Sequence, residues 1–463
     1  MLQQQEIKEI NEKEQQQLEI EQLLTALENE DIDQFRDLFL NIHPYERAKF
    51  YAKLSKETRV HVHRFLSPTE MAEVFENLEI DENDYEELLS EMDPTFVADM
   101  LSKMFADNAV DVLNELNKEQ VASYLTIMDE DAAGEIKQLL HYKEYTAGSI
   151  MTTEYIAIHA NQTVKSAMHI LKKEAPRAET IYYVYVIDEE KRLVGVISIR
   201  DLIVTDDDTM IHEIMNDRVV SVSVSEDQEE VARRMKDYNF LAVPVVDFQN
   251  HLLGIITVDD IIDVIDEEAS DDYSKLAGIS DVDSDDKNIF TSAKNRLPWL
   301  IILSFLGMLT ASLIGRFEAT LDQVAILAVF IPLIAGMAGN TGTQALAVAV
   351  RRIAIGEDED ENKWLLILRE AGTGVITGTV CGTVIMFVVY FWKGEFFLGL
   401  LVGFSILITL IVATLAGALV PLIMHRLKVD PAVASGPFIT TINDIISILI
   451  YFGLATLFMN YLV

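Results

Sequence analysis

A single carboxylate lies in the most apolar part of the chain. Asp444 is the only charged residue between Pro431 and the C-terminus, in a run long enough to cross a bilayer, which takes roughly 20 apolar residues. A carboxylate near the middle of a membrane helix costs on the order of 2.5–3.5 kcal/mol, so we expect it to face protein or water. Thr440, Thr441 and Asn443 precede it and can order water around an ion. The pattern predicts an ion site in a pore; the alternative is a buried acid hydrogen-bonded to a neighbouring helix.

This acid belongs to the last of several apolar segments. They lie near 297–317, 322–350, 364–392, 396–424 and 436–461. The two longer connections carry almost all of the Lys and Arg between segments, which predicts that they are cytoplasmic and that the C-terminus lies outside the cell membrane. Five helices with one buried acid make a poor pore alone. A two-fold homodimer would bring two Asp444 carboxylates to one axis.

The rest of the chain is strongly acidic. Of its 36 Lys+Arg and 75 Asp+Glu, only ten and eleven lie from Lys294 onward. The N-terminal two-thirds therefore forms a polar body without a basic patch, which excludes nucleic acid as a partner and favours divalent cations. The start of the chain does not have the plan of a signal peptide, so we expect this body to remain in the cytoplasm, attached to a lipid bilayer by the apolar segments.

The first part of the acidic body has a helical pattern. Residues 1–28 predict a charged, Gln-rich helix, and short amphipathic helices follow to about residue 142. Ser67-Pro68 and Asp93-Pro94 each place an N-cap residue before a proline at the first helical position. Stacked helical hairpins in a small superhelix are the expected form, and such a solenoid is typically a binding surface.

Residues 145–266 contain an internal repeat. The segment from Val186, VIDEEKRLVGVISIRDLI, recurs 59 positions later as VVDFQNHLLGIITVDDII. Each copy predicts a strand, a turn, a strand and a helix. The repeat resembles a tandem pair of CBS domains, which we place at 143–208 and 209–268.

The resemblance to CBS pairs implies a site for ATP or another adenosine nucleotide. Such pairs use a glycine, a hydroxyl and an acid at fixed spacing, and both copies have them. The first copy has Gly195, Ser198 and Asp201, with Tyr183 available to stack on the base and Arg200 to meet a phosphate; the second has Gly254, Thr257 and Asp260. The alternative is that these residues only cap the helices that follow them.

The second apolar segment contains IPLIAGMAGNTGTQ, residues 331–344. Its proline and glycines predict a loosened helix whose carbonyls face a cavity. Together with DPAVASGPFITTINDIISILIYFG in the last segment, it closely resembles the MgtE family of magnesium channels. The resemblance extends over nearly the whole chain. It implies an all-α superhelical N domain (1–142), the α/β CBS pair (143–268), an acidic linker with a connecting "plug" helix (269–296) and a five-helix transmembrane domain (297–463).

The family resemblance also implies a mechanism. Such a channel is a homodimer that passes Mg²⁺ down its gradient and closes when cytoplasmic Mg²⁺ is high. By that likeness Asp444 is the pore acid, Gly339 and Asn340 border the pore, and Asp430 lies at the cytoplasmic mouth. Magnesium sheds water reluctantly, so two aspartates that hold a hydrated ion suit its chemistry.

A Mg²⁺-controlled gate would explain the acidity of the soluble body. Acids crowd the second CBS copy, the linker and one region of the helical domain: Asp227, Glu229, Asp259, Asp260, Asp263, Asp266, Glu267, Glu268, Asp271 and Asp272, with Glu70, Asp107 and Asp111 across from them. Two carboxylates about 4 Å apart repel by roughly 4 kcal/mol at an effective dielectric of 20, so a compact arrangement needs bridging cations. Acidity for solubility alone is the alternative. Asn239 stands where the family is expected to offer a carboxylate, so one bridging site is expected to be weak.

No metal-hydrolase spacing, nucleophile elbow or phosphate-cradling loop is present, so the sequence does not predict an enzyme. Two other functions compete with a Mg²⁺-gated channel. One is an exchanger that couples Mg²⁺ to Na⁺ or H⁺, and the other is a membrane-anchored nucleotide or metal sensor.

Overall fold

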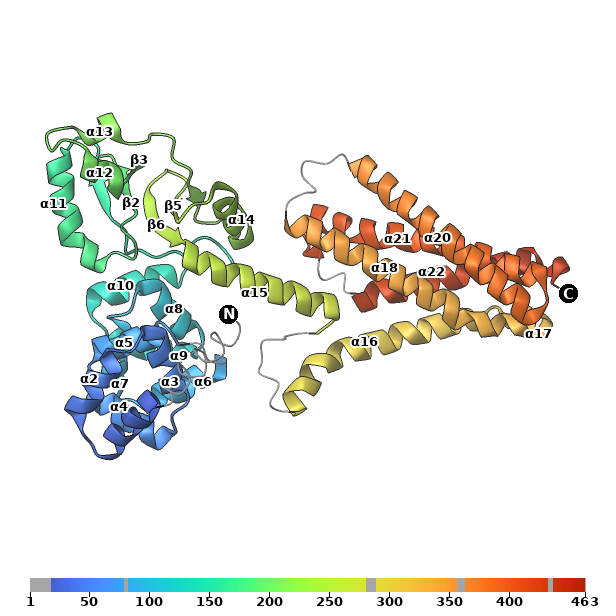
Figure 1. Cartoon of the computed structure of the whole chain (residues 1–463), viewed down its shortest axis with the longest axis horizontal. Helices are drawn as coiled ribbons and strands as arrows, with labels where there is room; N and C mark the ends of the chain where they lie inside the picture. The colour runs from blue at the N-terminus through green and yellow to red at the C-terminus, as the bar shows by residue number, and fades with distance from the viewer. Residues whose placement is uncertain (1–17, 79–81, 280–288, 356–362, 432–435, 463) are drawn as a thin grey trace, which may run out of the picture. The chain divides into compact units, whose positions relative to one another are not determined.

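The structure is a computed structural model that describes residues 18–78, 82–279, 289–355, 363–431 and 436–462. It consists of two compact units, residues 1–265 and 266–463. Parts of the predicted N-terminal helix (1–17), of the acidic linker (280–288) and of one membrane connection (356–362) lie outside the described residues. Figure 1 shows the helices and strands of each unit.

The first unit begins with short helices, as predicted. Residues 18–28 are helical, and the following helices are α2 (Ile32–Leu40), α3 (Pro44–Ala52), α4 (Lys56–Phe65), α5 (Pro68–Phe75), α6 (Glu82–Ser90), α7 (Pro94–Leu101), α8 (Ala106–Asn114), α9 (Lys118–Ile127) and α10 (Glu130–Leu139). Ser67 and Asp93 are the N-caps of α5 and α7, with a proline directly after each cap. Both predicted helix starts are confirmed.

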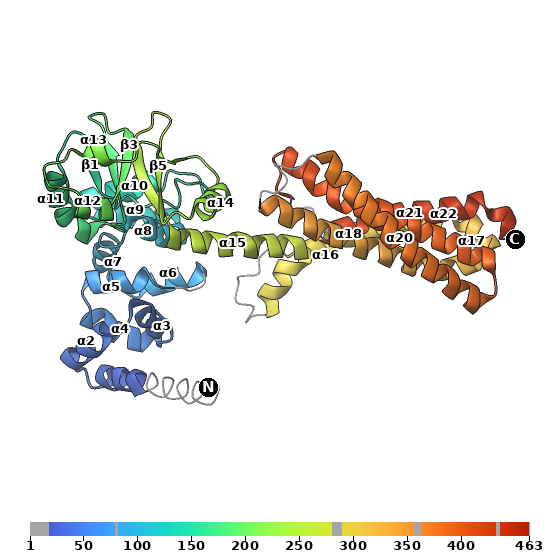
Figure 2. The same ribbon diagram turned by 45° about the horizontal axis from the view of Figure 1, so that its top comes forward.

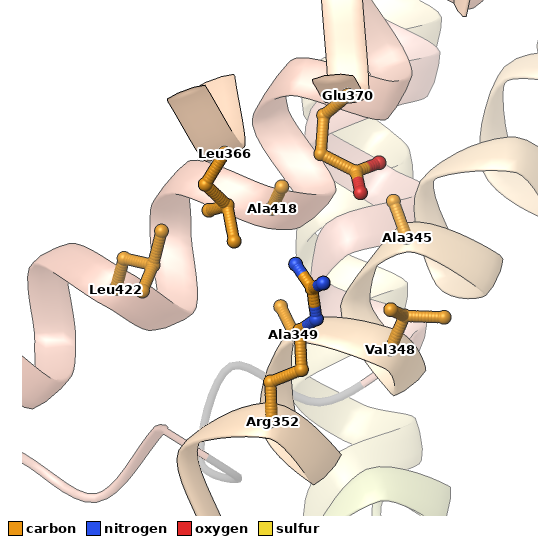
Figure 3. A pocket seen from close by; sticks show the side chains of 8 residues that line it. All are labelled: Ala345, Val348, Ala349, Arg352, Leu366, Glu370, Ala418 and Leu422. Carbon is orange, nitrogen blue, oxygen red and sulfur yellow. The ribbon is translucent and has the colours of Figure 1, made fainter. Parts of the chain in front are cut away.

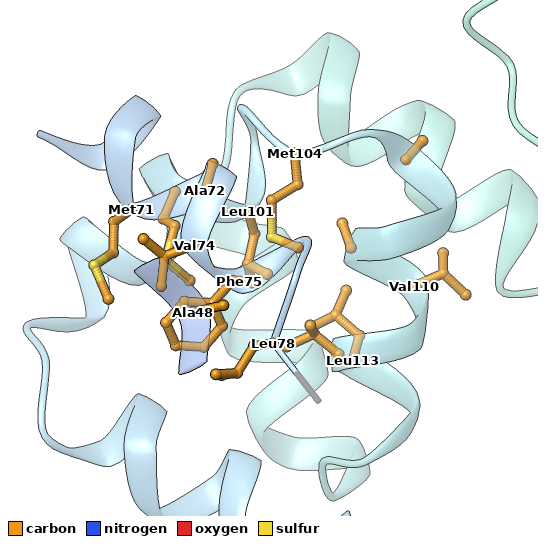
Figure 4. Packing of buried hydrophobic residues seen from close by; sticks show 14 of the residues in the cluster. Ala48, Met71, Ala72, Val74, Phe75, Leu78, Leu101, Met104, Val110 and Leu113 are labelled. Atoms are coloured by element: carbon orange, nitrogen blue, oxygen red, sulfur yellow. The ribbon is translucent and has the colours of Figure 1, made fainter. Parts of the chain in front are cut away.

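Apolar side chains from successive helices fill the centre of this helical domain. Met71, Val74 and Phe75 of α5 pack with Leu101 of α7 and Leu113 of α8, and all five are almost fully buried (Figure 4). Each helix packs mainly against the second helix along the chain, as α3 does with α5, α5 with α7 and α7 with α9, which is the packing expected of stacked hairpins in a solenoid.

The predicted repeat forms two three-stranded sheets. The first copy contains β1 (Ala157–His159), α11 (Val164–Glu174), a 3₁₀ turn (Ala175–Arg177), β2 (Tyr183–Ile187), β3 (Leu193–Ser198), α12 (Ile199–Val204) and α13 (Ile211–Ile214). The second contains β4 (Val222–Ser223), α14 (Gln228–Tyr238), β5 (Ala242–Val246), β6 (Leu252–Thr257) and α15 (Val258–Ala277). In each copy a parallel strand pair is extended by an antiparallel hairpin, and Val186 opposite Gly195 corresponds to Val245 opposite Gly254.

Helices and strands of the first copy share one core. Val164, Ala167 and Leu171 of α11 pack with Val184 and Val186 of β2 in a buried cluster. The two strand residues, Val184 and Val186, are β-branched, which suits a pleated and buried surface. The fold class predicted for this part is therefore confirmed.

The second unit begins within α15 and contains the membrane helices. These are α16 (Ile289–Gly315), α17 (Glu318–Gln323), a 3₁₀ segment (Ala325–Phe330), α18 (Ile331–Ala354), α20 (Lys363–Lys393), α21 (Phe396–Arg426), α22 (Gly436–Leu457) and a last 3₁₀ turn (Met459–Tyr461). Among the described residues, five stretches are long and apolar enough to cross a membrane: Ser292–Gly315, Ala325–Ala354, Trp364–Lys393, Phe396–Arg426 and Gly436–Leu457. Both views show α18, α20, α21 and α22 side by side (Figures 1 and 2).

Two features of these helices differ from the sequence prediction. The stretch 331–344 is a continuous part of α18, because Pro332 falls at the start of the helix, where a proline is tolerated. The prediction of a loosened helix is wrong. Residues 289–296 belong to the first membrane helix, which continues through Pro298, whereas the acidic segment 269–277 continues the last CBS helix as the end of α15.

Glycines hold α20 and α21 together. A Cβ at Gly374 would lie 2.8 Å from Cα of Ile411, and one at Gly378 would lie 2.9 Å from the Leu407 carbonyl oxygen. A Cβ at Gly403 would lie 2.5 Å from the Gly382 carbonyl oxygen. The glycines at 374, 378 and 382 therefore let α20 and α21 approach closely. A row of small residues at the same spacing on α16 (Gly307, Ala311 and Gly315) has open space at both glycines in the single chain.

Candidate functional site

Asp444 lies near the middle of α22 and is the only charged residue in that helix. The helix α18 crosses it closely. Thr343 Oγ1 of α18 lies 3.3 Å from Thr440 Oγ1 of α22, and a Cβ at Gly339 would lie 2.7 Å from Cγ2 of Thr440. Glycine is required at residue 339 for this approach. The two stretches that carry the predicted pore residues are thus adjacent.

Asn340 follows Gly339 on α18 and has an exposed side chain in the single chain. At the end of the α18–α22 seam, Thr343, Thr440 and Thr441 line an open hollow together with Leu276 of α15 and Leu303 of α16. Neutral hydroxyl groups therefore line an approach to the helix that bears Asp444.

A cluster of acids, which we call the mouth cluster, surrounds one lysine where α15 ends: Asp271, Asp272, Lys275 and Asp430. The ammonium group of Lys275 forms ion pairs with both Asp271 and Asp430. Although burial opposes it, these hydrogen bonds raise the pKa of Lys275 above its ordinary value. Burial and the charge of Asp430 raise the pKa of Asp272 to about 6. The structure thus brings two predicted regulatory acids, Asp271 and Asp272, and the predicted mouth residue Asp430 together around Lys275, a cation that the prediction did not include.

A second group of acids, the buried cluster, lies within the first unit. Its members come from α5, α8, the CBS pair and the connections before its strands: Glu76, Asp107, Glu154, Glu179 and Asp260. Asp107 is 9% exposed, and its Oδ1 has no hydrogen-bond partner among the described residues. Burial, and then the charge of Asp260, raises the pKa of Asp107 well above its ordinary value.

Other members of the buried cluster are destabilised as anions in the same way. Burial and the charges of Asp260 and Asp259 raise the pKa of Glu179 to about 7. Burial also raises the pKa of Asp260, against a hydrogen bond that its Oδ2 accepts from Thr257 Oγ1 at 2.5 Å. Acids that are packed together with raised pKa values bind a cation favourably, because the cation offsets both the burial and the mutual repulsion.

Sequence reasoning missed three of these acids. Glu76, Glu154 and Glu179 come from separate elements, and none belongs to the acidic run. Glu76 accepts a hydrogen bond from the Phe105 backbone N–H (2.9 Å), and Glu154 accepts one from the Ala106 backbone N–H (3.3 Å). Both thus lie at the start of α8, beside Asp107. Only the fold brings them together, so the sequence held no signal for them.

Two predicted metal-binding acids cap helices instead. The Glu70 carboxylate completes the capping box with Ser67 and is ion-paired with Arg36. Asp227 accepts a hydrogen bond from the Glu229 backbone N–H (3.0 Å) at the start of α14. The structure does not place Glu70 or Asp227 in either acidic cluster. Their predicted metal role remains a prediction.

The remaining predicted acids are placed more simply. Asp263 contributes to the raised pKa of Asp260, Asp111 lies one turn after Asp107 on α8, and Glu229 is exposed. Asn239 ends α14 with a left-handed backbone (φ 54°), a conformation that asparagine adopts more easily than most residues. Within the described residues, no group of three or more His, Cys, Asp or Glu side chains is arranged to hold a metal ion.

The predicted nucleotide residues surround the end of β3. Ser198 Oγ donates to Asp201 Oδ2 at 2.6 Å and caps α12, as Thr257 and Asp260 do at the start of α15. Arg200 and Asp201 are exposed, and Tyr183 is half-buried. A Cβ at Gly195 would lie 2.5 Å from the Met215 sulfur, so this glycine also permits close packing. Capping and nucleotide binding are compatible with one another in this arrangement.

Two charged side chains line one pocket of the membrane unit. Arg352 of α18 and Glu370 of α20 point into one pocket that is otherwise lined by alanine, valine and leucine (Figure 3). Glu370 was not among the predicted site residues.

Comparisons with known proteins agree with this arrangement. Residues 331–454 match the family of divalent cation transporters called MgtE, residues 42–145 match the MgtE intracellular N domain, and residues 147–206 and 211–267 match the CBS domain. The chain is 54% identical over 441 residues to the magnesium transporter MgtE of Enterococcus faecalis, covering 95% of this chain and 97% of that protein. It is 40% identical over the same coverage to that of Bacillus subtilis.

Solved structures resemble the soluble part. The crystal structure of the soluble part of a magnesium transporter is 56% identical, with a TM-score of 0.54, covering 55% of this chain and 99% of that one. The cytosolic domain of the Mg²⁺ channel MgtE in complex with ATP is 38% identical, with a TM-score of 0.50, covering 53% of this chain and 99% of that one. The full-length relatives are transporters, so the prediction of a non-enzymatic function is confirmed. The chain belongs to the MgtE family of divalent cation transporters.

Proposed function

We propose that this protein is a magnesium channel of the cell membrane in which Asp444 is the charged element of the pore. The observation that carries the proposal is the single acid of α22, beside the hydroxyl-lined seam with α18. An intramembrane acid of this kind marks an ion pathway by default. Mg²⁺ is the expected ion because the full-length relatives are named magnesium transporters.

The pore requires two copies of the chain. One carboxylate neutralises half of the charge of a hydrated dication, whereas the two carboxylates of a symmetric dimer neutralise all of it. The α16 span has no buried residues in the single chain, and its small-residue row is open at Gly307 and Gly315. A second copy would cover such a surface. With the basic connections in the cytoplasm, the soluble unit is cytoplasmic and the C-terminus lies outside.

Cytoplasmic Mg²⁺ would close the channel by binding to the acidic clusters. The buried cluster is costly without a cation, as the raised pKa values of Asp107 and Glu179 indicate. Bound Mg²⁺ would stabilise the arrangement in which these acids are close. Helix α15 contains both Asp260 and Lys275, and Lys275 is ion-paired with the mouth residue Asp430. Through this helix, stabilisation of the closed arrangement would reach Asp430. ATP would bind at Tyr183, Gly195, Ser198, Arg200 and Asp201, since a relative's cytosolic domain has been crystallised with ATP.

The test is Mg²⁺ flux into liposomes that contain the purified protein. We expect flux in the unmodified protein, its loss in Asp444→Ala, and its inhibition by Mg²⁺ on the face that bears the soluble unit. Deletion of residues 1–270 should remove that inhibition and leave the flux. Flux that requires a Na⁺ or H⁺ gradient would instead indicate an exchanger. Normal flux in Asp444→Ala would refute the proposed pore.

A further inference from the structure

The seam between α18 and α22 is lined by hydroxyl groups that are already satisfied. Thr343 Oγ1 donates to the Gly339 carbonyl (3.0 Å), Thr440 Oγ1 to the Gly436 carbonyl (2.9 Å), and Ser447 Oγ to the Asp444 carbonyl (2.8 Å). Each bond closes within its own helix. These side chains therefore require nothing further from their surroundings.

Asn443 differs from these hydroxyl residues. It is 1% exposed, and neither its Oδ1 nor its Nδ2 has a hydrogen-bond partner among the described residues. A buried polar group without a partner costs roughly 1–3 kcal/mol, and hydrocarbon surroundings make the cost larger. An amide with both ends unpaired, directly before the pore acid in the sequence, is therefore a group that needs a polar ligand.

The position of this amide is fixed by its neighbours. A Cβ at Gly342 of α18 would overlap Asn443 Nδ2 and lie 3.1 Å from Cγ2 of Ile439. On its other side, Gly342 is packed against Gly417 of α21, where a Cβ would lie 2.9 Å from Cβ of Ala345. The seam thus accommodates the asparagine only because α18 has no side chain there. This arrangement keeps the amide inside the helix bundle, away from lipid.

We infer that Asn443 is a hydration site: its amide holds ordered water beside Asp444 and so helps the pore to accept a cation that keeps its own water shell. The inference rests on the proposed function. Buried waters typically make about three hydrogen bonds to polar groups that otherwise lack partners. Magnesium keeps its water more firmly than Ca²⁺, so water-ordering groups next to the pore acid favour it over dications that shed water more readily. Asn443 is in this sense a positioning residue for the transported ion.

The test compares two substitutions of similar or smaller size in the full-length protein in liposomes. Asn443→Leu keeps most of the volume but removes both hydrogen-bonding groups, whereas Asn443→Ser keeps a donor and an acceptor. Mg²⁺ and Ca²⁺ fluxes are measured on the same preparations. We expect Asn443→Leu to lower the Mg²⁺-to-Ca²⁺ flux ratio by about five- to tenfold, the size of one lost hydrogen bond, and Asn443→Ser to retain most of it.

A merely structural asparagine would behave differently. Replacing an unpaired buried amide with leucine would then leave the flux ratio unchanged, with unchanged or higher thermal stability, and that result would overturn the inference. If Asn443→Leu does not assemble, Asn443→Ala removes the amide without branching and gives the same readout. The flux ratio is the deciding quantity in each case.

A second pair of variants separates packing from hydration. Gly342→Ala should destabilise the protein because its Cβ overlaps the Asn443 amide. Adding Asn443→Ala should restore the stability, because the overlap is removed, but should not restore the Mg²⁺-to-Ca²⁺ ratio. Recovery of both would overturn the hydration role. Failure of the proposed function is distinct: it would appear as Mg²⁺ flux in Asp444→Ala equal to that of the unmodified protein.

Discussion

The two acidic clusters solve the same electrostatic problem in different ways. In the mouth cluster, Lys275 places its ammonium group between Asp271 and Asp430. In the buried cluster, burial raises the pKa values of Asp107, Glu179 and Asp260, and the charge of Asp260 adds to the effect on Asp107 and Glu179. The first cluster has an internal cation; for the second, we propose that a cation from solution or protons offset the charge. Crowded acids alone therefore do not identify a Mg²⁺ sensor, because the charge balance differs between the two clusters.

This contrast predicts how much of the protein's magnesium-dependent stabilisation comes from each cluster. The stabilisation is the gain in thermal stability between Mg²⁺-free and Mg²⁺-saturated buffer. The full-length protein in detergent is the sample in each experiment. An exposed acid outside both clusters, Asp206 on the loop after α12, supplies the control substitution Asp206→Asn, which should change nothing.

Asp107→Asn should have the largest effect. The substitution removes one charge from the buried cluster and provides a donor for a neighbouring carboxylate, so the Mg²⁺-free protein should gain about 1–2 kcal/mol. Most of the magnesium-dependent stabilisation should be lost with it. The measurement is thermal unfolding with and without Mg²⁺. A variant that is destabilised without Mg²⁺, or that keeps the full response, would contradict the role assigned to this cluster.

Lowering the pH should replace part of the Mg²⁺ effect. The pKa of Glu179 is raised from 4.5 to about 7, so the folded state binds its proton more tightly than the unfolded state does. The resulting stability is complete below pH 4.5 and is lost as the pH rises through 7. Without Mg²⁺, the protein should be more stable at pH 6 than at pH 8, and the Mg²⁺ increment should be smaller at pH 6.

Glu179→Gln should flatten this pH dependence. The pKa of the mouth residue Asp272 is also raised, from 3.8 to about 6. Its contribution to stability is therefore lost mainly below pH 6, outside the range from pH 6 to pH 8 that the experiment compares. A Mg²⁺-dependent gain in stability that grows as the pH falls would contradict this prediction.

Lys275→Met should make the mouth cluster resemble the buried one. Loss of the ammonium group leaves Asp271, Asp272 and Asp430 without their internal cation, so Mg²⁺ should stabilise the variant by an additional amount of about 1 kcal/mol or less, because the lysine is partly exposed. Lys275→Arg, which keeps the charge, is the matched control. Equal Mg²⁺ responses of the Met and Arg variants would show that the lysine does not balance this cluster.

Glu70→Gln should leave the Mg²⁺ response unchanged. It weakens the capping box with Ser67 and the ion pair with Arg36, so it should cost about 1 kcal/mol in both buffers. A reduced Mg²⁺ increment would restore Glu70 as a metal-binding residue, as the sequence analysis predicted.

The parts of the fold that depend on local pattern were predictable. The repeat gave the strands on either side of Gly195 and Gly254, and the Ser-Pro and Asp-Pro pairs gave the starts of α5 and α7. Asp444 stood out because charge is rare in an apolar run. Lys275 had a readable signal that was overlooked: it is the only basic residue between Asp266 and Ala277, four positions after Asp271.

Other parts depend on tertiary contacts that no local pattern encodes. Glu76, Glu154 and Glu179 converge because α5, α8 and the CBS pair pack together within one unit. The glycines of α18 suggested a loosened helix. In the structure, the Asn443 side chain and the backbone of Gly417 pack into the space beside Gly342. A glycine in a membrane helix can serve packing or flexibility, and only its neighbours distinguish the two.

The glycine row of α20 also has a mechanical consequence. Where Gly378 meets Leu407 and Gly382 meets Gly403, main-chain atoms of two helices touch without intervening side chains. Neither helix can slide or roll without driving backbone against backbone, since packed interiors resist such strain. Gly417 of α21 meets the Gly342 carbonyl of α18 in the same way. Helices α18, α20 and α21 are therefore the rigid part of the membrane unit, and displacement is easier for α16 and α22.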